Sequence, residues 1–183
     1  MGLACLAGLV GCQQADRPWT EGVWSQRVPD YPFVPHRVLV HPLTRAARGE
    51  DGRWALRVHF LFLDAWDDQV KGLGRAQVQL HALGRWEGRP IDPIAWEAID
   101  LNDLTANRRH YDPITRTYVL EVPEPAMPAW LVRALDELED RASRPGEAYR
   151  TFAGPLVVRV VYEAVLADDQ TVLASNDFML APG

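Results

Sequence analysis

The sequence has few of the nucleophilic residues, Cys, Ser and Lys, on which covalent catalysis commonly depends. Its 183 residues include only two cysteines, Cys5 and Cys12, so the chain beyond position 12 has neither a disulfide nor a cysteine-based zinc site. Serine occurs only at positions 25, 143 and 175, and none of these lies in a G-x-S-x-G nucleophile elbow. Lys71 is the only lysine, and it falls in a predicted turn, where a desolvated Schiff-base lysine is unfavourable.

Other signatures are missing as well. The sequence has no H-E-x-x-H pair, no P-loop and no G-x-G-x-x-G after a strand. The net charge of −6 disfavours nucleic acid as a partner, because phosphate binding needs clustered Lys and Arg. We therefore expect a non-enzymatic protein without a cofactor. A metal-dependent hydrolase is an alternative, and it would need a cleft in which Asp and His side chains converge.

The chain opens with an uncharged apolar stretch over residues 2–11. Ten residues are too few to span a bilayer as a helix, but they match the apolar region of a secretory signal. The sequence Leu9-Val10-Gly11-Cys12 resembles the lipobox of bacterial lipoproteins. The resemblance implies that Cys12 is acylated and begins the mature chain, and that lipid anchors the protein to a bacterial membrane, in the cell envelope. The alternative is a loosely packed N-terminus or a short buried strand.

The pattern divides the chain into three parts. Residues 1–11 would be the remnant of the signal, and residues 12–35 the acylated cysteine with a tether. The tether is polar, contains several prolines and shows no lasting hydrophobic period. Residues 36–183 are long enough for one domain.

Strand patterns recur through this domain. In residues 53–65, Trp54, Val58 and Phe60 fall on one face by alternation. Similar runs, separated by turn-forming residues, occupy positions 36–43, 76–83, 94–101, 114–122, 154–167 and 171–180. The last two predict a hairpin. This mainly β pattern predicts an antiparallel β-sandwich, Ig-like or prealbumin-like.

One segment has a helical period instead. Leu131, Leu135 and Leu138 recur at helical spacing, Pro128 suits a helix start, and Pro145-Gly146 ends the run. We predict one amphipathic helix near 129–142 that covers an end or edge of the sheets. Residues 102–113 form a polar stretch in which we expect a loop.

A second resemblance lies in residues 60–83, FLFLDAWDDQVKGLGRAQVQLHAL. A strand that ends in Asp, a turn and a strand of alternating Val and polar residues resemble the opening of prealbumin-like modules, such as transthyretin and the carboxypeptidase regulatory-like domains. The family turn often contains Gly and Pro, whereas Asp68-Gln69-Val70 stands there in this sequence. The resemblance covers 24 residues and implies a fold without implying an activity.

Several aromatic residues lie in or next to predicted loops: Trp66, Trp86, Trp96 and Tyr111. Flat exposed rings can stack on sugars or form a contact surface for another envelope protein. These residues are therefore our candidate ligand or partner surface, and a carbohydrate-binding module is an alternative function. Large aromatics also fill the corners of a β-sandwich, so packing is a further interpretation.

Metal ligands are harder to assemble from this sequence. Weak calcium candidates cluster in two loops, at Asp64, Asp67 and Asp68 and at Asp100, Asn102 and Asp103. Asp and Asn also populate turns because they bond to the local backbone. His59 and His81 would be neighbours if their strands formed a hairpin, and would be separated in a prealbumin-like sandwich. Two ligands do not make a zinc site, so we expect these histidines on solvated sheet faces.

Overall fold

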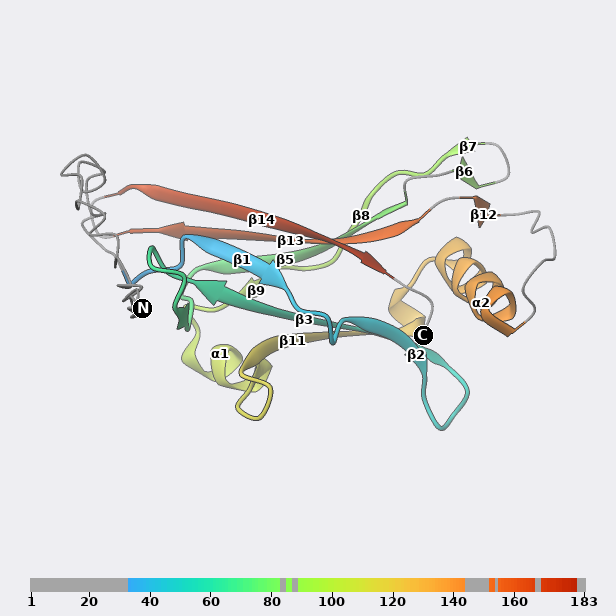
Figure 1. Cartoon of the computed structure of the whole chain (residues 1–183), viewed down its shortest axis with the longest axis horizontal. Helices are drawn as coiled ribbons and strands as arrows, with labels where there is room; N and C mark the ends of the chain where they lie inside the picture. The colour runs from blue at the N-terminus through green and yellow to red at the C-terminus, as the bar shows by residue number, and fades with distance from the viewer. Residues whose placement is uncertain are drawn as a thin grey trace, which may run out of the picture.

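The structure is a computed structural model that describes residues 33–82, 85–86, 89–143, 152–153, 155–166 and 169–180. The predicted signal, the lipidation site Cys12 and most of the predicted tether lie outside these residues. The described chain is mainly β, as predicted, with two long antiparallel sheets (Figure 1).

The first sheet is built around β3 (Trp54–Leu63), the longest strand on this side. Its strand order is β1-β3-β11-β10, and β2 and β4 also pair with β3. The partners of β3 are β1 (Arg37–Val40), β2 (Arg45–Arg48), β4 (Gln69–Val70) and β11 (Thr117–Pro123), and β10 (Tyr111–Asp112) pairs with β11.

The second sheet has the order β14-β13-β5-β8, with β9 also paired to β5. Its strands are β5 (Arg75–Ala82), β8 (Ile94–Ala95), β9 (Ile99–Asp100), β13 (Leu156–Val165) and β14 (Thr171–Leu180). The predicted hairpin is confirmed, because β13 and β14 pair along their full length. A small third sheet joins β6 (Arg85–Trp86), β7 (Arg89–Pro90) and β12 (Phe152–Ala153).

The hydrophobic core lies between the two long sheets. Alternation places the apolar residues of β3 on the inner face, where they meet the inner residues of β5 and β13. The rings of Phe62 and Tyr162 join the sheets, with centroids 4.5 Å apart. Phe60 stacks on Tyr118 at 5.6 Å within the first sheet. The sheets therefore form two layers around one core.

The predicted helix is confirmed as α2 (Ala129–Ser143), which lies at one end of the two sheets (Figure 1). Leu131, Ala134 and Leu135 are buried in the core cluster, so the helix covers the core at this end. A short 3₁₀ helix, η1 (Glu124–Ala126), leads into it.

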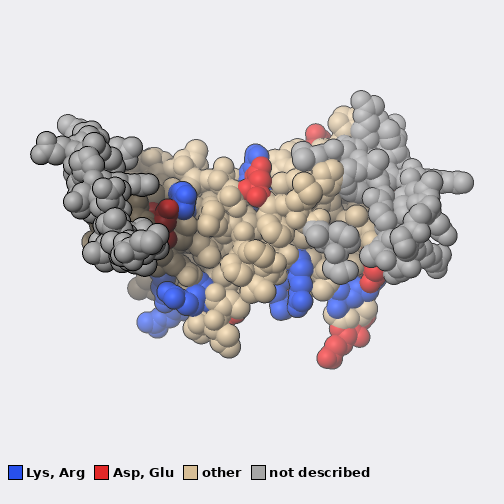
Figure 2. All heavy atoms as spheres, viewed as in Figure 1, with Lys and Arg blue, Asp and Glu red and all other residues tan. Residues whose placement is uncertain are grey.

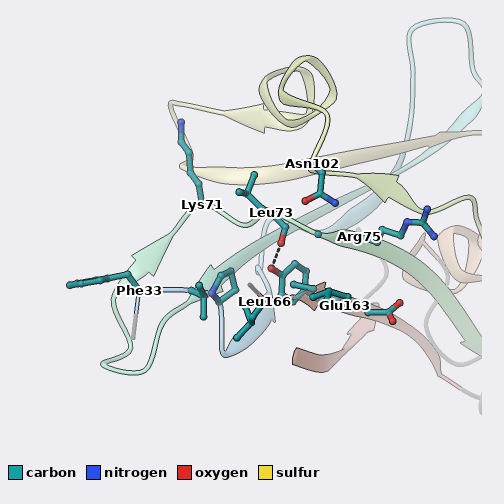
Figure 3. A pocket seen from close by; sticks show the side chains of 13 residues that line it. Phe33, Lys71, Leu73, Arg75, Asn102, Glu163 and Leu166 are labelled. Atoms are coloured by element: carbon teal, nitrogen blue, oxygen red, sulfur yellow. Dashed lines mark hydrogen bonds between the residues drawn. The ribbon is translucent and has the colours of Figure 1, made fainter. Parts of the chain in front are cut away.

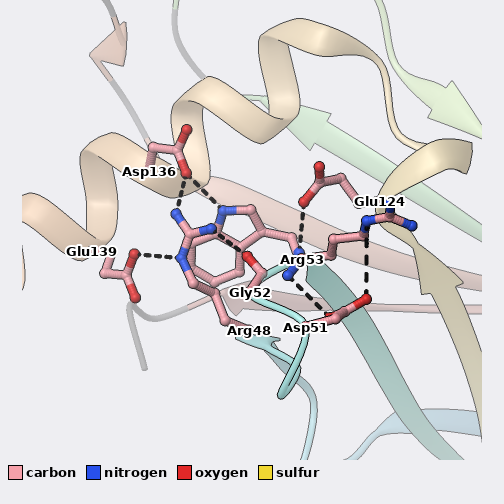
Figure 4. Close-up of polar contacts among 8 residues, drawn as sticks. Arg48, Asp51, Gly52, Arg53, Glu124, Asp136 and Glu139 are labelled. Carbon is pink, nitrogen blue, oxygen red and sulfur yellow. Dashed lines mark hydrogen bonds and ion pairs between the residues drawn. The ribbon is translucent and has the colours of Figure 1, made fainter.

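An arginine holds α2 against the β2–β3 hairpin. The Arg48 guanidinium forms ion pairs with Asp136 at 2.6 Å and with Glu139 at 2.8 Å, and lies 4.5 Å from the Trp54 ring centroid (Figure 4). The Trp54 indole N–H also donates to Asp136. Each partly exposed ion pair contributes about 0.5 kcal/mol, against about 2 kcal/mol for a buried leucine. Packing therefore supplies most of the free energy that holds the helix in place, and the ion pairs add to it.

Two local predictions were wrong. The stretch 102–113 is not a loop throughout, because α1 (Leu104–His110) forms within it. Asp103 caps this helix by accepting from the Thr105 backbone N–H. The predicted strand 94–101 is broken into the two-residue strands β8 and β9, which pair with separate parts of β5.

One side of the two-layer core is closed by the edge strands β1 and β14. They come from opposite sheets and lie side by side, as the contacts between them and Figure 1 show. The Val40 backbone N–H donates to the Asn176 side chain at 2.9 Å. A side chain thus satisfies a donor at the edge of β1 and connects the two sheets there.

Candidate functional site

The end of the sheets opposite α2 is where the described chain enters the domain. β1 begins here at Arg37, β3 and β13 end here at Leu63 and Val165, and β5 begins here at Arg75. The β3–β4 turn and the β13–β14 turn therefore meet at the same end as residues 33–36 (Figure 1). We call this part of the molecule the entry end.

The β3–β4 turn is held by a buried carboxylate. Asp64 is 3% exposed and accepts from the backbone N–H groups of Trp66, at 2.9 Å, and of Asp68, at 3.0 Å. Asp67 takes a positive φ of 68°, which Asp tolerates better than most residues. These bonds fix a tight turn that presents the Trp66 side chain outward, 51% exposed.

Among the residues that the structure describes, nine large hydrophobic side chains are exposed, and four of them gather at the entry end: Phe33, Trp66, Leu73 and Val165. We call them the entry-end surface. Phe33 packs its ring against Trp66 with centroids 5.1 Å apart. Phe33, Leu73 and Val165 all line one groove, so the four side chains lie around the same part of the surface. Clustered exposed apolar side chains indicate a contact surface more strongly than single ones.

The groove has a volume of about 600 Å³. Its lining comes from the entering chain, from residues 71–75 and from the end of β13, and includes Pro35, Tyr162 and Leu166. In Figure 3, Lys71, Arg75 and Glu163 extend outward and do not point to a common position. The arrangement offers apolar contact without the convergent polar groups that orient a small polar ligand.

The floor of this end is a hydrogen-bonded polar network. The Tyr162 hydroxyl donates to the Leu73 carbonyl. Asn107 of α1 donates from Nδ2 to the carbonyls of Gly72 and Leu101, both at 2.8 Å, and accepts from the Tyr118 hydroxyl at 3.0 Å. Burial raises the pKa of Tyr162 and also that of Tyr118, so both phenols are protonated at neutral pH. The network is structural, and it ties α1 to the strands.

A glycine permits the close contact between two strands beside the groove. Gly74 has a φ of 132°, which L side chains rarely adopt. A Cβ built there would lie 2.4 Å from the Glu163 carbonyl oxygen and 2.9 Å from the Ala164 Cβ. Only glycine therefore fits where β5 begins against β13.

His59 is buried, which corrects our expectation of a solvated side chain. It is 7% exposed on the outer face of β3. Its backbone N–H donates to the Thr44 hydroxyl, which in turn donates to the His59 carbonyl. The junction between β1 and β2 thus contributes to covering a residue that alternation alone would place in solvent. His81 lies on β5 in the other sheet, so the two histidines are separated. This is the arrangement expected if the two strands belong to different sheets and do not form a hairpin.

A chain of side-chain hydrogen bonds leads from His59 to a carboxylate. His59 Nδ1 is 3.0 Å from the Thr117 hydroxyl, which bonds to Thr115 at 2.8 Å, and Thr115 donates to Asp112. Burial is the main cause that lowers the pKa of His59, and nearby Arg57 lowers it further. Bonds from Ile114 and Thr115 lower the pKa of Asp112. Thr117 is 0% exposed, so this hydroxyl cannot reach a substrate in solution.

Among the calcium candidates, partners within the chain are found for the side chains of Asp64, Asp67, Asp100, Asn102 and Asp103. Asp67 pairs with Arg37 at 2.6 Å, and Asp100 accepts from both the backbone and the side chain of Asn102. Asp103 caps α1, and Asp64 caps the β3–β4 turn. Among the residues that the structure describes, no group of three or more His, Cys, Asp or Glu could hold a metal ion. Calcium binding stays a prediction.

The candidate aromatic residues are placed in different surroundings. Trp66 lies at the entry end, whereas the Trp96 indole donates to the Ala126 carbonyl, beside η1. The ring of Tyr111 packs against Tyr118 and lies under the Lys71 ammonium group, 4.2 Å from its ring centroid. The side chain of Trp86 lies outside the described part. Trp66 and Trp96 are not brought onto one platform.

Charge is unevenly spread over the molecule. Figure 2 shows that the middle of the face seen in Figure 1 has few charged side chains, whereas Lys and Arg gather along its lower edge. Arg108, Arg109 and His110 lie in the last turn of α1, where they complement the helix dipole.

No helix of the described residues is long and apolar enough to cross a membrane.

Sequence reasoning found Trp66 but missed the other three members of the entry-end surface. Leu73 stands between two glycines, and Phe33 lies in what the pattern predicts as the tether. Val165 fits the pattern of a buried strand. Their grouping depends on where strands from distant parts of the chain end, which no local pattern encodes. The weak local signal was the isolated leucine in the G-L-G turn.

No protein-family model matches this chain, and no curated protein or solved structure is significantly similar to it.

Proposed function

We propose that this protein is a lipid-anchored, non-enzymatic binding module of the bacterial cell envelope. The lipobox-like sequence that ends at Cys12 supports the anchor. The two-layer β core, with β3 and β5 in different sheets, supports a prealbumin-like β-sandwich as the anchored domain. Such domains carry their binding residues on loops at the ends of the sheets, and the sheets form a rigid scaffold that positions these loops.

The observation that carries the proposal is the entry-end surface. Phe33, Trp66, Leu73 and Val165 leave apolar area exposed around a groove of about 600 Å³. Exposing these side chains costs solvation free energy unless they are covered in the working state of the protein. The surface also lies where the chain coming from Cys12 joins the domain, so binding and anchoring are combined at one end.

The intact mass of the protein, purified in detergent from a bacterial membrane fraction, tests the anchor. We expect cleavage before Cys12 and an added acyl mass in the wild type, with at least two chains needed for stable attachment. Cys12→Ala abolishes both. Cys5→Ala is the matched control, because Cys5 would leave with the signal and its loss changes nothing in the mature mass.

A full-length, unmodified chain in the soluble fraction would contradict this proposal. Cys5 and Cys12 would then both be free thiols. An intracellular role would have to be considered in place of the envelope.

A further inference from the structure

We infer that the entry-end surface contacts the lipid bilayer itself, with Phe33 and Trp66 seated among the lipid headgroups. This inference rests on the proposed function, since it specifies what the anchored domain binds. It adds a second membrane contact, made by side chains of the folded domain, to the lipid on Cys12.

The position of the attachment point supports a membrane as the occupant. Twenty residues separate Cys12 from Phe33, a reach of at most about 70 Å when fully extended. The domain is therefore confined near the bilayer, and the entry end is the part to which the connecting chain is joined. α2 covers the opposite end of the core (Figure 1), whereas Phe33, Trp66, Leu73 and Val165 are exposed at the entry end.

The side chains at this end suit the interfacial region of a membrane. Trp and Phe both have a large apolar ring surface. Trp also has a polar N–H group, and it is enriched at the headgroup level of membranes. Trp66 is held outward by the Asp64-capped turn, and Phe33 lines the groove and packs its ring against Trp66. Leu73 and Val165 are 55% and 67% exposed at the same end. The two rings are thus exposed at an end that also exposes aliphatic side chains.

The charges around this surface indicate that apolar contact, and not attraction to anionic lipid, supplies the binding. The whole chain carries a net charge of −6. At the entry end, Arg37 is paired with Asp67, and the Lys71 ammonium group lies over the Tyr111 ring. Binding should therefore persist as salt is raised, unlike the binding of a polybasic segment, which salt screens.

The test uses the full chain with Cys12→Ser, so that no lipid is attached, and sucrose-loaded vesicles of phosphatidylethanolamine and phosphatidylglycerol. Co-sedimentation gives the partition coefficient. Phe33→Ala with Trp66→Ala should lower this coefficient by about tenfold or more, since both rings lose their contact with lipid. The matched control is Leu43→Ala with Met179→Ala, two exposed side chains away from the entry end, which should leave the coefficient unchanged.

Four outcomes would overturn the inference. The Cys12→Ser chain could fail to bind vesicles at any lipid concentration tested, or the two double variants could bind equally well. Release of the protein by salt would assign the contact to basic side chains instead. If sedimentation equilibrium showed that the Phe33/Trp66 variant loses a dimer without a change in vesicle binding, the occupant would be a second copy of the chain.

This test and the test of the proposed function fail separately. Acylation of Cys12 without vesicle binding by the domain refutes only the membrane contact. If the Cys12→Ser chain binds vesicles but the wild type from the membrane fraction carries no acyl mass, only the lipid anchor is refuted.

Discussion

Replacing Asn107 by Ala should destabilise the domain by about 2.5 kcal/mol. Asn107 is 8% exposed, and its amide makes three hydrogen bonds, to the carbonyls of Gly72 and Leu101 and to the Tyr118 hydroxyl. Each such bond contributes about 1 kcal/mol net, and its loss leaves a buried partner unsatisfied. Ala is the better helix former by about 0.5 kcal/mol, which offsets part of the loss.

Urea unfolding of the Cys12→Ser chain, followed by circular dichroism, measures this difference. The midpoint should fall while the slope with denaturant stays the same, because the surface exposed on unfolding is unchanged. Arg109→Ala on the same short helix is the control, since this exposed side chain should change the free energy of unfolding by less than about 0.5 kcal/mol.

A double-mutant cycle sharpens the test. Tyr118→Phe alone removes the bond to Asn107 and the bond that the Tyr118 hydroxyl accepts from the Gly72 N–H. Because the two side chains share one bond, their effects should not add, and the coupling should be about 1 kcal/mol. A loss below about 1 kcal/mol for Asn107→Ala, or strictly additive effects, would refute the view that this network holds α1 in place.

Two further predictions concern stability. Because the pKa of His59 is lowered in the folded state, the unfolded chain takes up the proton first; stability should fall as the pH drops from about 6.5 towards the lowered pKa. The free energy of unfolding, measured between about pH 7 and about pH 5, should decrease in this way in the wild type and in the control His81→Gln. If His59→Gln leaves the slope of this free energy with pH unchanged, the prediction is contradicted. Gly74→Ala should cost about 3 kcal/mol or more through strain and a clash with β13, whereas Gly52→Ala, with φ 75° and open space around it, should cost about 1 kcal/mol. Equal thermal denaturation midpoints for the two glycine variants would show that the β5–β13 contact is not the cause.

The sequence predicts the elements whose pattern is long and regular. The alternation in 53–65 and the leucine spacing in 129–142 correspond to β3 and α2 with shifts of at most two residues at each end. These patterns are reliable because many side chains on one face must be buried together.

The missed elements are short, and their cause is tertiary. α1 has seven residues, and its buried side chain is the polar Asn107, so no apolar period marks it. His59 alternates towards solvent and is nevertheless buried under partners from a turn and a neighbouring strand. The entry-end surface could not be predicted either, since it assembles where residues 33, 66, 73 and 165 meet in space.

The contact between the edge strands β1 and β14 has a consequence for how the chain folds. The Val40 N–H donates to the Asn176 side chain, 136 residues later, so this side of the core cannot close until Asn176 has been synthesised. Contacts of such large sequence separation pay their loop-closure entropy late and slow the folding reaction. Any N-terminal fragment that ends before β13 leaves β1 and the inner faces of β3 and β5 uncovered. The domain can therefore reach its native state only after the β13–β14 hairpin has been synthesised. A chain shortened before this hairpin should aggregate instead of folding.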